Sequence, residues 1–193
     1  MNRYDAPPAP RPTREELAAA RGRGVADVIA PALKVLFCGI NPGLYSAAVG
    51  HHFARPGNRF WTALFRAGFT DRLLPPSDER LLLADGYGIT NIVDHATAQA
   101  SELSAEELRA GARLLEKKVR AFRPRILAVL AIGAYRKAFG RPAAPPGPQR
   151  EKIGETALWV LPNPSGINAA YQMADLVRLF SELRAAGLSS STG

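Results

Sequence analysis

Four short apolar runs, each as long as a β-strand and each separated from the next by helical or loop sequence, constrain the fold of this chain most. They lie at residues 33–40, 87–93, 125–132 and 157–161. Each run is mostly apolar, with apolar residues at neighbouring positions, which is the pattern of a strand covered on both faces. Strands of this kind that alternate with helices predict an α/β fold: a three-layer sandwich with a central, mainly parallel four- to five-stranded sheet flanked by helices.

Helical sequence fills the intervals between these runs. The clearest helix begins at Ser104, which precedes Glu106 and Glu107 in a near capping box. Apolar residues then recur at spacings of three and four until Pro124 ends the pattern. Further helices are expected at 58–67, at 77–85 with Ser77 as the cap, at 133–139 and at 170–186, and a loop is expected at 142–148.

The length of 193 residues fits one compact domain, which we place at residues 25–188, followed by a short polar tail at 189–193. Residues 1–24 are rich in Pro and Arg and poor in large apolar side chains, so a mobile basic arm is expected there. No apolar run approaches the roughly 20 residues of a membrane span, and the N-terminus lacks the apolar segment of a secretory signal. We therefore expect a cytoplasmic protein that does not bind membranes.

The amino-acid composition and the absence of certain motifs exclude several kinds of site and enzyme class. A single cysteine, Cys38, excludes an internal disulfide, and the three histidines form no zinc-binding pattern, so no metal is expected. Lys and Arg exceed Asp and Glu by 25 to 17, a formal charge of +8, which favours a polyanionic partner such as nucleic acid. The chain also lacks a P-loop, a dinucleotide-binding glycine motif after a strand and the nucleophile elbow of serine esterases.

Two Asn-Pro turns follow apolar runs that lie far apart in the sequence. Asn41-Pro42 follows the first run, and Asn163-Pro164 follows the last. Ligands of parallel α/β sheets bind where the carboxyl ends of the strands converge, so we expect these turns to face each other across one crevice. Asn, Pro and Gly also favour ordinary turns, and that alternative stays open at this point.

Five motifs carry a resemblance to a known family. They are GINPGL at 39–44, GHHF at 50–53, PGNRFW at 56–61, GITNIVD at 88–94 and LPNPSG at 161–166. In this order they resemble the mismatch-specific uracil/thymine-DNA glycosylases, one branch of the uracil-DNA glycosylase superfamily. The resemblance implies that the nucleotide is swung out of the duplex and that the bond between its base and deoxyribose is hydrolysed. It implies an abasic product without strand cleavage, and neither a metal nor an organic cofactor.

The resemblance also implies catalytic residues. Asn41 matches the family's asparagine that positions the attacking water; a side-chain amide can orient water but cannot accept a proton at neutral pH. A carboxylate near the sugar would stabilise its developing positive charge, and Asp94, expected at the end of the second strand, is our candidate. Alternatively, Asp94 caps the following turn or pairs with a local arginine.

Base-binding positions follow from the same resemblance. Phe53 supplies the ring on which the extruded base stacks, or alternatively it is a core aromatic residue. Asn91 is expected to hydrogen-bond the edge of the base. Tyr45 replaces a smaller residue common in relatives, so it either narrows the pocket or stacks at its rim. The full set of expected base contacts is Ile40, Gly43, Tyr45, Ser46, Phe53 and Asn91.

The second Asn-Pro turn resembles the family's wedge loop, which enters the duplex and fills the space left by the flipped nucleotide. Ile167 is the expected apolar plug, with Gly166 and Asn168 contacting the widowed guanine; the arginine common in relatives is missing here. The expected wedge residues are Asn163, Ser165, Gly166, Ile167 and Asn168. The expected phosphate contacts are Arg55 and Arg59, with Arg11, Arg14, Arg21 and Arg23 in the arm.

The predicted protein is thus a monomeric, monofunctional DNA glycosylase. Its expected partner is double-stranded DNA that contains uracil, thymine or ethenocytosine opposite guanine. Two alternatives remain open: an enzyme of another superfamily branch that acts on deaminated purines or single-stranded DNA, and a protein that binds lesions without cleaving them.

Overall fold

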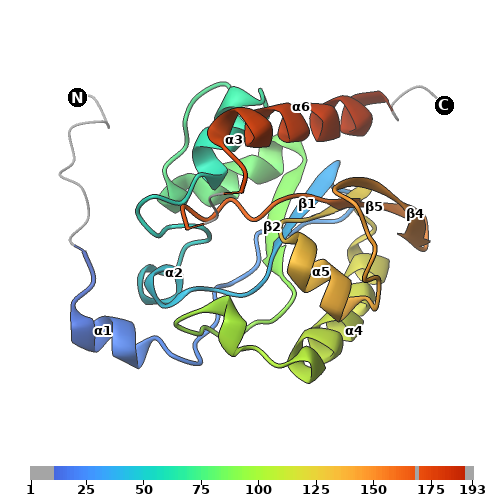
Figure 1. Ribbon diagram of the computed structural model, residues 1–193. Coiled ribbons are helices and arrows are strands. Elements are labelled where there is room, and N and C mark those ends of the chain that lie inside the picture. The colour runs from blue at the N-terminus through green and yellow to red at the C-terminus, as the bar shows by residue number, and fades with distance from the viewer. Residues whose placement is uncertain (1–10, 168–169, 190–193) are drawn as a thin grey trace.

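A five-stranded sheet with the strand order β2-β1-β3-β5-β4 forms the centre of the molecule (Figure 1). The structure, a computed structural model, describes residues 11–167 and 170–189. β4 is antiparallel to β5, and all other neighbouring strands are parallel. The strands are β1 (Val35–Gly39), β2 (Tyr87–Asn91), β3 (Ile126–Val129), β4 (Gly147–Ile153) and β5 (Thr156–Val160).

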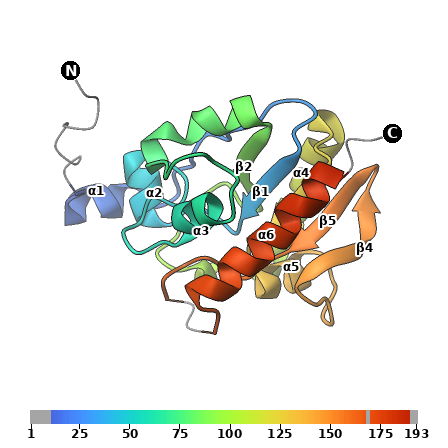
Figure 2. The ribbon, with the colours of Figure 1, turned by 90° about the horizontal axis from the view of Figure 1, so that it is seen from above.

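Helices cover both faces of this sheet, which confirms the predicted three-layer α/β sandwich (Figures 1 and 2). Side chains of β1 alternate between the two layers. Phe37 packs edge-on against Phe60 at 5.5 Å between ring centroids and stacks on Phe180 at 5.9 Å. Leu36 and Cys38 point into the opposite core. One layer contains α3 (Phe60–Arg66), α6 (Met173–Ser189) and the 3₁₀ helix η1 (Pro76–Asp85), and the other contains α4 (Ala105–Phe122) and α5 (Ile132–Ala138).

The ends of α4 follow the sequence closely. The Ser104 side chain accepts a hydrogen bond from the Glu107 backbone N–H at 3.1 Å, and the Glu107 carboxylate accepts one from the Ser104 N–H at 2.8 Å. This reciprocal capping box confirms the predicted helix start. At the other end Arg123 is left-handed, with φ 49°, and Pro124 follows, so the helix stops where the proline predicts.

Three elements differ from the sequence-based expectation. β4 overlaps a stretch expected to be a loop, because an edge strand bonded on one side carries mostly exposed polar residues and lacks a continuous apolar run. A short helix, α2 (Leu44–Val49), follows the first Asn-Pro turn and was not predicted. The helix expected at 77–85 is a 3₁₀ helix that begins at Pro76, so Ser77 is not its cap.

The N-terminal segment is attached to the domain over much of the stretch expected to be a mobile arm. It forms α1 (Arg14–Ala19), which lies beside α2 (Figure 1). The Gly22 N–H donates to the Ala96 carbonyl, and the Ala96 N–H donates to the Arg23 carbonyl, both at 2.9 Å. A pair of backbone hydrogen bonds of this kind fixes one segment against another. Within the described part of the chain, no helix is long and apolar enough to cross a membrane.

Candidate active site at the carboxyl edge of the sheet

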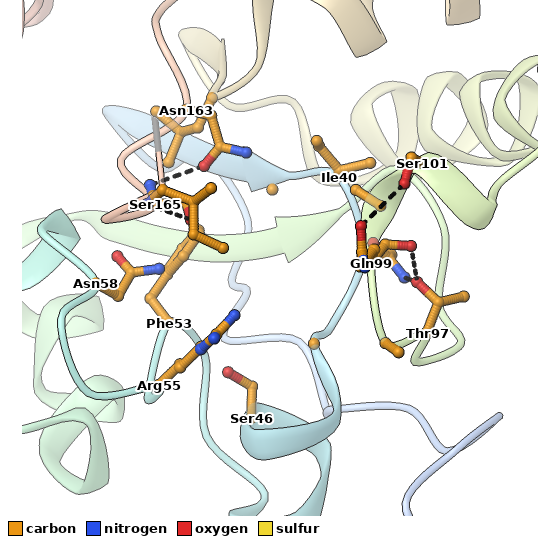
Figure 3. Close-up of a pocket in the computed structure, with 17 residues that line it drawn as sticks. Ile40, Ser46, Phe53, Arg55, Asn58, Thr97, Gln99, Ser101, Asn163 and Ser165 are labelled. Carbon is orange, nitrogen blue, oxygen red and sulfur yellow. Dashed lines mark hydrogen bonds between the residues drawn. The ribbon is translucent and has the colours of Figure 1, made fainter. Parts of the chain in front are cut away.

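A cavity of about 450 Å³ lies at the carboxyl edge of the sheet, where both Asn-Pro turns contribute to its lining (Figure 3). Its lining comes from Leu130, directly after β3, and from four segments: the turn after β1 with the start of α2, residues 53–58, residues 97–101, and residues 163–167. Asn41 and Asn163 both line it, as the sequence led us to expect. The size suits a small ligand, since binding pockets commonly measure roughly 300–1,000 Å³.

The Asn41 side chain is held by its nitrogen. Nδ2 donates to the His95 carbonyl at 3.0 Å and to Thr97 Oγ1 at 2.8 Å, which uses both of its hydrogens. Oδ1 accepts no hydrogen bond from any of the described residues, and Asn41 lines the cavity. The amide therefore offers the cavity a hydrogen-bond acceptor in a defined place.

Asp94, the carboxylate that we expected near the sugar, does not line this cavity. β2 ends at Asn91, in register with Gly39, rather than at Asp94. Two further backbone bonds, from Ile92 N to the Gly39 carbonyl and from Val93 N to the Ile40 carbonyl, continue the pairing. The chain then leaves the sheet and Asp94 is exposed. None of the described residues that line the cavity is Asp or Glu.

Phe53 forms an aromatic wall of the cavity. Its ring stacks on Phe60 with the centroids 4.2 Å apart and the planes at 27°, and it is half-buried. The backbone of Phe53 is left-handed, with φ 53°, an unusual conformation for a bulky residue. Buried Glu79 holds the preceding residues in place: its carboxylate accepts from the His52 N–H at 2.8 Å and lies 3.1 Å from His51 Nδ1. The ring is therefore positioned by its neighbours, as a stacking platform requires.

His52 and Asn91 lie next to this aromatic wall but do not line the cavity. Burial lowers the pKa of His52 below its ordinary value, against the opposing effect of nearby Glu79. The neutral ring donates from Nε2 to the Ala26 carbonyl at 3.1 Å, and its Nδ1 lies 3.5 Å from Asn91 Nδ2. Asn91 is only 6% exposed, does not line the cavity and lies so close to Gly39 that a Cβ there would collide with its Oδ1. The structure therefore places Asn91 beside the cavity wall and not in the lining, where the expected contact with the base would lie.

Arg59 holds the wedge loop instead of facing solvent. Its guanidinium donates to the carbonyls of Pro164 at 3.3 Å, Ser165 at 2.9 Å and Tyr171 at 2.6 Å. We expected Arg59 to contact phosphate, but in this structure its guanidinium bonds to three backbone carbonyls, and its backbone N–H also donates to the Pro164 carbonyl at 3.0 Å. Gly166 also packs closely on the backbone of Gly57, where a Cβ would lie 2.6 Å from the Gly57 carbonyl oxygen.

The wedge loop presents an exposed apolar side chain beside the cavity. Asn163 Oδ1 accepts from the Ser165 N–H at 2.9 Å, which closes a tight turn. Ile167 then lines the cavity while 75% exposed, an unusual position for a large apolar residue. Exposed Arg55 lines the same cavity, and Asn168 lies outside the described residues.

The remaining expected residues divide between the cavity and its surroundings. Tyr45 is half-buried on α2 and does not line the cavity, and neither does Gly166. The expected residues that do line it are Ile40, Asn41, Gly43, Ser46, Phe53, Arg55, Asn163, Ser165 and Ile167. The Ser46 hydroxyl accepts from the Ala54 N–H at 3.1 Å, which ties α2 to the Phe53 segment.

Sequence reasoning missed one whole wall of the cavity. It consists of residues 97–101 and carries Thr97, Gln99 and Ser101 (Figure 3). This segment has no motif of its own, and its bond to Asn41 joins residues 56 positions apart. Asn58 was also missed, although it precedes α3 and its Oδ1 accepts from the Phe60 N–H at 2.9 Å, a capping signal that the sequence does contain.

Two further kinds of reactive group that a site of this kind could contain are a cysteine nucleophile and a metal-binding cluster. Burial raises the pKa of the Cys38 thiol, so Cys38 remains protonated at neutral pH and is a poor nucleophile. Over residues 11–167 and 170–189, no group of three or more His, Cys, Asp or Glu side chains is arranged to hold a metal ion. The polar groups that the described lining residues offer are therefore side-chain amides, hydroxyl groups, the Arg55 guanidinium and backbone groups.

Comparisons with known proteins agree with this architecture. Residues 26–184 match the uracil DNA glycosylase superfamily. The fold is similar to the solution NMR structure of a candidate uracil DNA glycosylase from Methanosarcina acetivorans, with a TM-score of 0.57 and 18% sequence identity. That match covers 84% of this chain and 98% of the other, and at such low identity the likeness concerns the fold alone.

Proposed function

The chain belongs to the uracil DNA glycosylase superfamily, and on this premise we propose that it excises uracil, and by the same chemistry thymine or ethenocytosine, opposite guanine in double-stranded DNA. The product is an abasic site and a free base. One observation carries the proposal: Asn41, whose amide nitrogen is bonded to His95 and Thr97, lines a cavity that is also lined by the aromatic ring of Phe53 and by the exposed side chain of Ile167.

Substrate enters this cavity as a nucleotide turned out of the helix. Extruding a base costs a few kcal/mol, and less at a mispair, so a weak pair is itself part of the selectivity. Stacking on Phe53 returns roughly 1 to 3 kcal/mol, because the ring is already held by Phe60 and by its own backbone. Binding therefore favours the extruded state without rearrangement of the platform.

The composition of the lining favours a dissociative reaction. Cleavage of the glycosidic bond leaves positive charge on the sugar and negative charge on the base. No described carboxylate lines the cavity to accept a proton from water, so the bond breaks first and a water held by Asn41 Oδ1 then adds to the sugar cation. The proton that this water loses neutralises the departing base anion. No lysine is among the described lining residues, which favours simple hydrolysis over a Schiff base and strand cleavage.

DNA engagement follows from the exposed groups around the opening. Ile167 can fill the space that the flipped nucleotide leaves, because its side chain is 75% exposed and its loop is held by Arg59. Arg55 lies at the same opening and is the best-placed cation for a backbone phosphate. The formal charge of +8 supports salt-dependent binding to DNA.

A panel of oligonucleotides tests the proposal. Duplexes with uracil, thymine, ethenocytosine or hypoxanthine, and the matching single strands, are incubated with the protein and then treated with alkali to cleave abasic sites. We expect uracil opposite guanine to be released fastest and to require alkali for strand cleavage. Release of hypoxanthine or of single-strand lesions alone would instead indicate another branch. Tight lesion binding without release would indicate a non-catalytic protein.

A further inference from the structure

The hydroxyl group of Thr97 links Asn41 to the wall of the cavity that has no sequence motif. We propose that Thr97 is a positioning residue that selects the orientation of the Asn41 amide, so that Oδ1 rather than Nδ2 faces the cavity. The inference deepens the proposed function and rests on it to the extent that Asn41 Oδ1 orients the attacking water. Thr97 itself contacts Asn41 and is only 8% exposed.

The direction of each hydrogen bond carries this argument. Thr97 Oγ1 donates its one hydrogen to the Gln99 carbonyl at 2.8 Å, so toward Asn41 it can only accept. The second partner of Asn41, the His95 carbonyl, is an acceptor in any state. An Asn41 amide rotated by 180° would place Oδ1 against these two acceptors and turn both N–H groups away from them. The relay from Asn41 through Thr97 to Gln99 therefore favours one amide orientation.

The backbone that carries this relay is itself held in place. Ala96, between the two partners of Asn41, exchanges backbone hydrogen bonds with Gly22 and Arg23 of the N-terminal segment, both at 2.9 Å. Thr97 N donates to the Pro42 carbonyl at 3.3 Å, which joins the segment directly to the first Asn-Pro turn. Farther along, Arg21 pairs with Glu102 at 2.7 Å. The N-terminal segment thus supports the residues that orient Asn41.

The primary test compares three variants in single-turnover base release. Thr97→Val keeps the shape of the side chain but removes the acceptor, and we expect about a tenfold slower rate with unchanged DNA affinity. Thr97→Ser keeps the hydroxyl and should recover most of the rate. Thr156→Val is the matched control, because Thr156 Oγ1 also donates to a backbone carbonyl, that of Pro124 at 2.6 Å, but outside the cavity. An unchanged rate in Thr97→Val, or equal losses in Thr97→Ser, would overturn the proposal.

A double-mutant cycle shows whether Thr97 acts through Asn41. In an Asn41→Ala background the relay has no amide to orient, so adding Thr97→Val should not slow the residual reaction further. A full tenfold additional loss in the double variant would mean that Thr97 acts by another route, and the proposal would be wrong.

A second readout does not depend on activity. In the ¹⁵N NMR spectrum, the two Asn41 side-chain amide hydrogens should both exchange slowly in the wild-type protein and in Thr97→Ser. In Thr97→Val the hydrogen that had bonded to Thr97 should exchange faster. If the wild-type protein releases no base, the proposed function fails while this measurement still judges the relay. Unchanged exchange in Thr97→Val would contradict the relay whatever the activity.

Discussion

The two Asn-Pro turns look alike in the sequence, but the Asn41 side chain bonds to residues more than 50 positions away, whereas the Asn163 side chain bonds within its own turn. Asn41 donates through its nitrogen to the His95 carbonyl and Thr97 Oγ1. Asn163 accepts through its oxygen from the Ser165 N–H at 2.9 Å and so closes its own turn. The first turn leaves the Asn41 amide oxygen without a hydrogen bond from any described residue, whereas the second leads to Ile167, whose side chain is exposed.

The two turns are also held in place by different parts of the molecule. The first turn is joined to the sheet and to the segment that contains Thr97, so it is suited to placing one atom accurately. The second turn is held by Arg59, which donates to the carbonyls of Pro164 and Ser165 in the turn and of Tyr171 beyond it, and so it presents a side chain on a supported loop. We expect catalysis to depend on the first turn and duplex engagement on the second.

The largest expected effect comes from Asn41→Ala. It removes the group that orients water but little contact surface, so single-turnover base release should fall at least about 100-fold while DNA affinity stays nearly constant. Rapid-quench kinetics and a binding titration measure the two quantities. Equal losses in rate and affinity would mean that the first turn mainly binds DNA and would erase the contrast between the turns.

Ile167→Ala should weaken binding to duplex DNA, which we expect to depend on the second turn. Burial of three carbon groups in the duplex contributes about 2 kcal/mol, so affinity for double-stranded substrate should weaken roughly 10- to 30-fold. Single-stranded substrate has no stack to fill and should be affected much less. Protein stability should not change, because the side chain is already exposed. Similar losses on both substrates would remove the wedge role from the second turn.

The pH dependence of the free energy of unfolding tests the contribution of His52, the residue that precedes Phe53. Because burial lowers the pKa of His52, the unfolded chain binds a proton that the folded state resists. The stabilisation that neutral His52 gives to the folded state is therefore complete above about pH 6.5. It declines as the pH falls from there through the pKa of His52 in the folded state. Glu79, Asp27 and His51 are the charged or titratable groups near this ring.

Urea unfolding at several pH values from 7.5 to 5 measures this contribution. The wild-type protein should lose more stability across the range than His52→Gln, which has no proton to bind at that position. Identical slopes for the two proteins would show that His52 is not the responsible group.

Asp94→Asn should give the smallest effect. Its side chain is exposed and does not line the cavity, so the single-turnover rate should stay within about twofold of the wild-type rate. A loss as large as that of Asn41→Ala would mean that the carboxylate reaches the sugar in the DNA complex, and the dissociative reaction proposed above would need revision.

Local sequence predicted those parts of the fold that depend on local interactions. The capping residues of α4 and the consecutive apolar strands were correctly identified, because each is stabilised by neighbours in the sequence or by burial on both faces. β4 was missed because pairing with β5, and not its own polar residues, makes it a strand. Asp94 was placed at a strand end because β2 was predicted two residues too long.

The sequence by itself determined the α/β architecture and the presence of two Asn-Pro turns after buried strands, since both depend on short-range patterns. Only the tertiary structure decided which atoms of those turns face the cavity. That choice depends on Thr97 and Arg59, and their partners lie 56 and more than 100 positions away in the chain. A side-chain amide carries a donor and an acceptor, and its orientation is set by whichever groups the fold brings beside it.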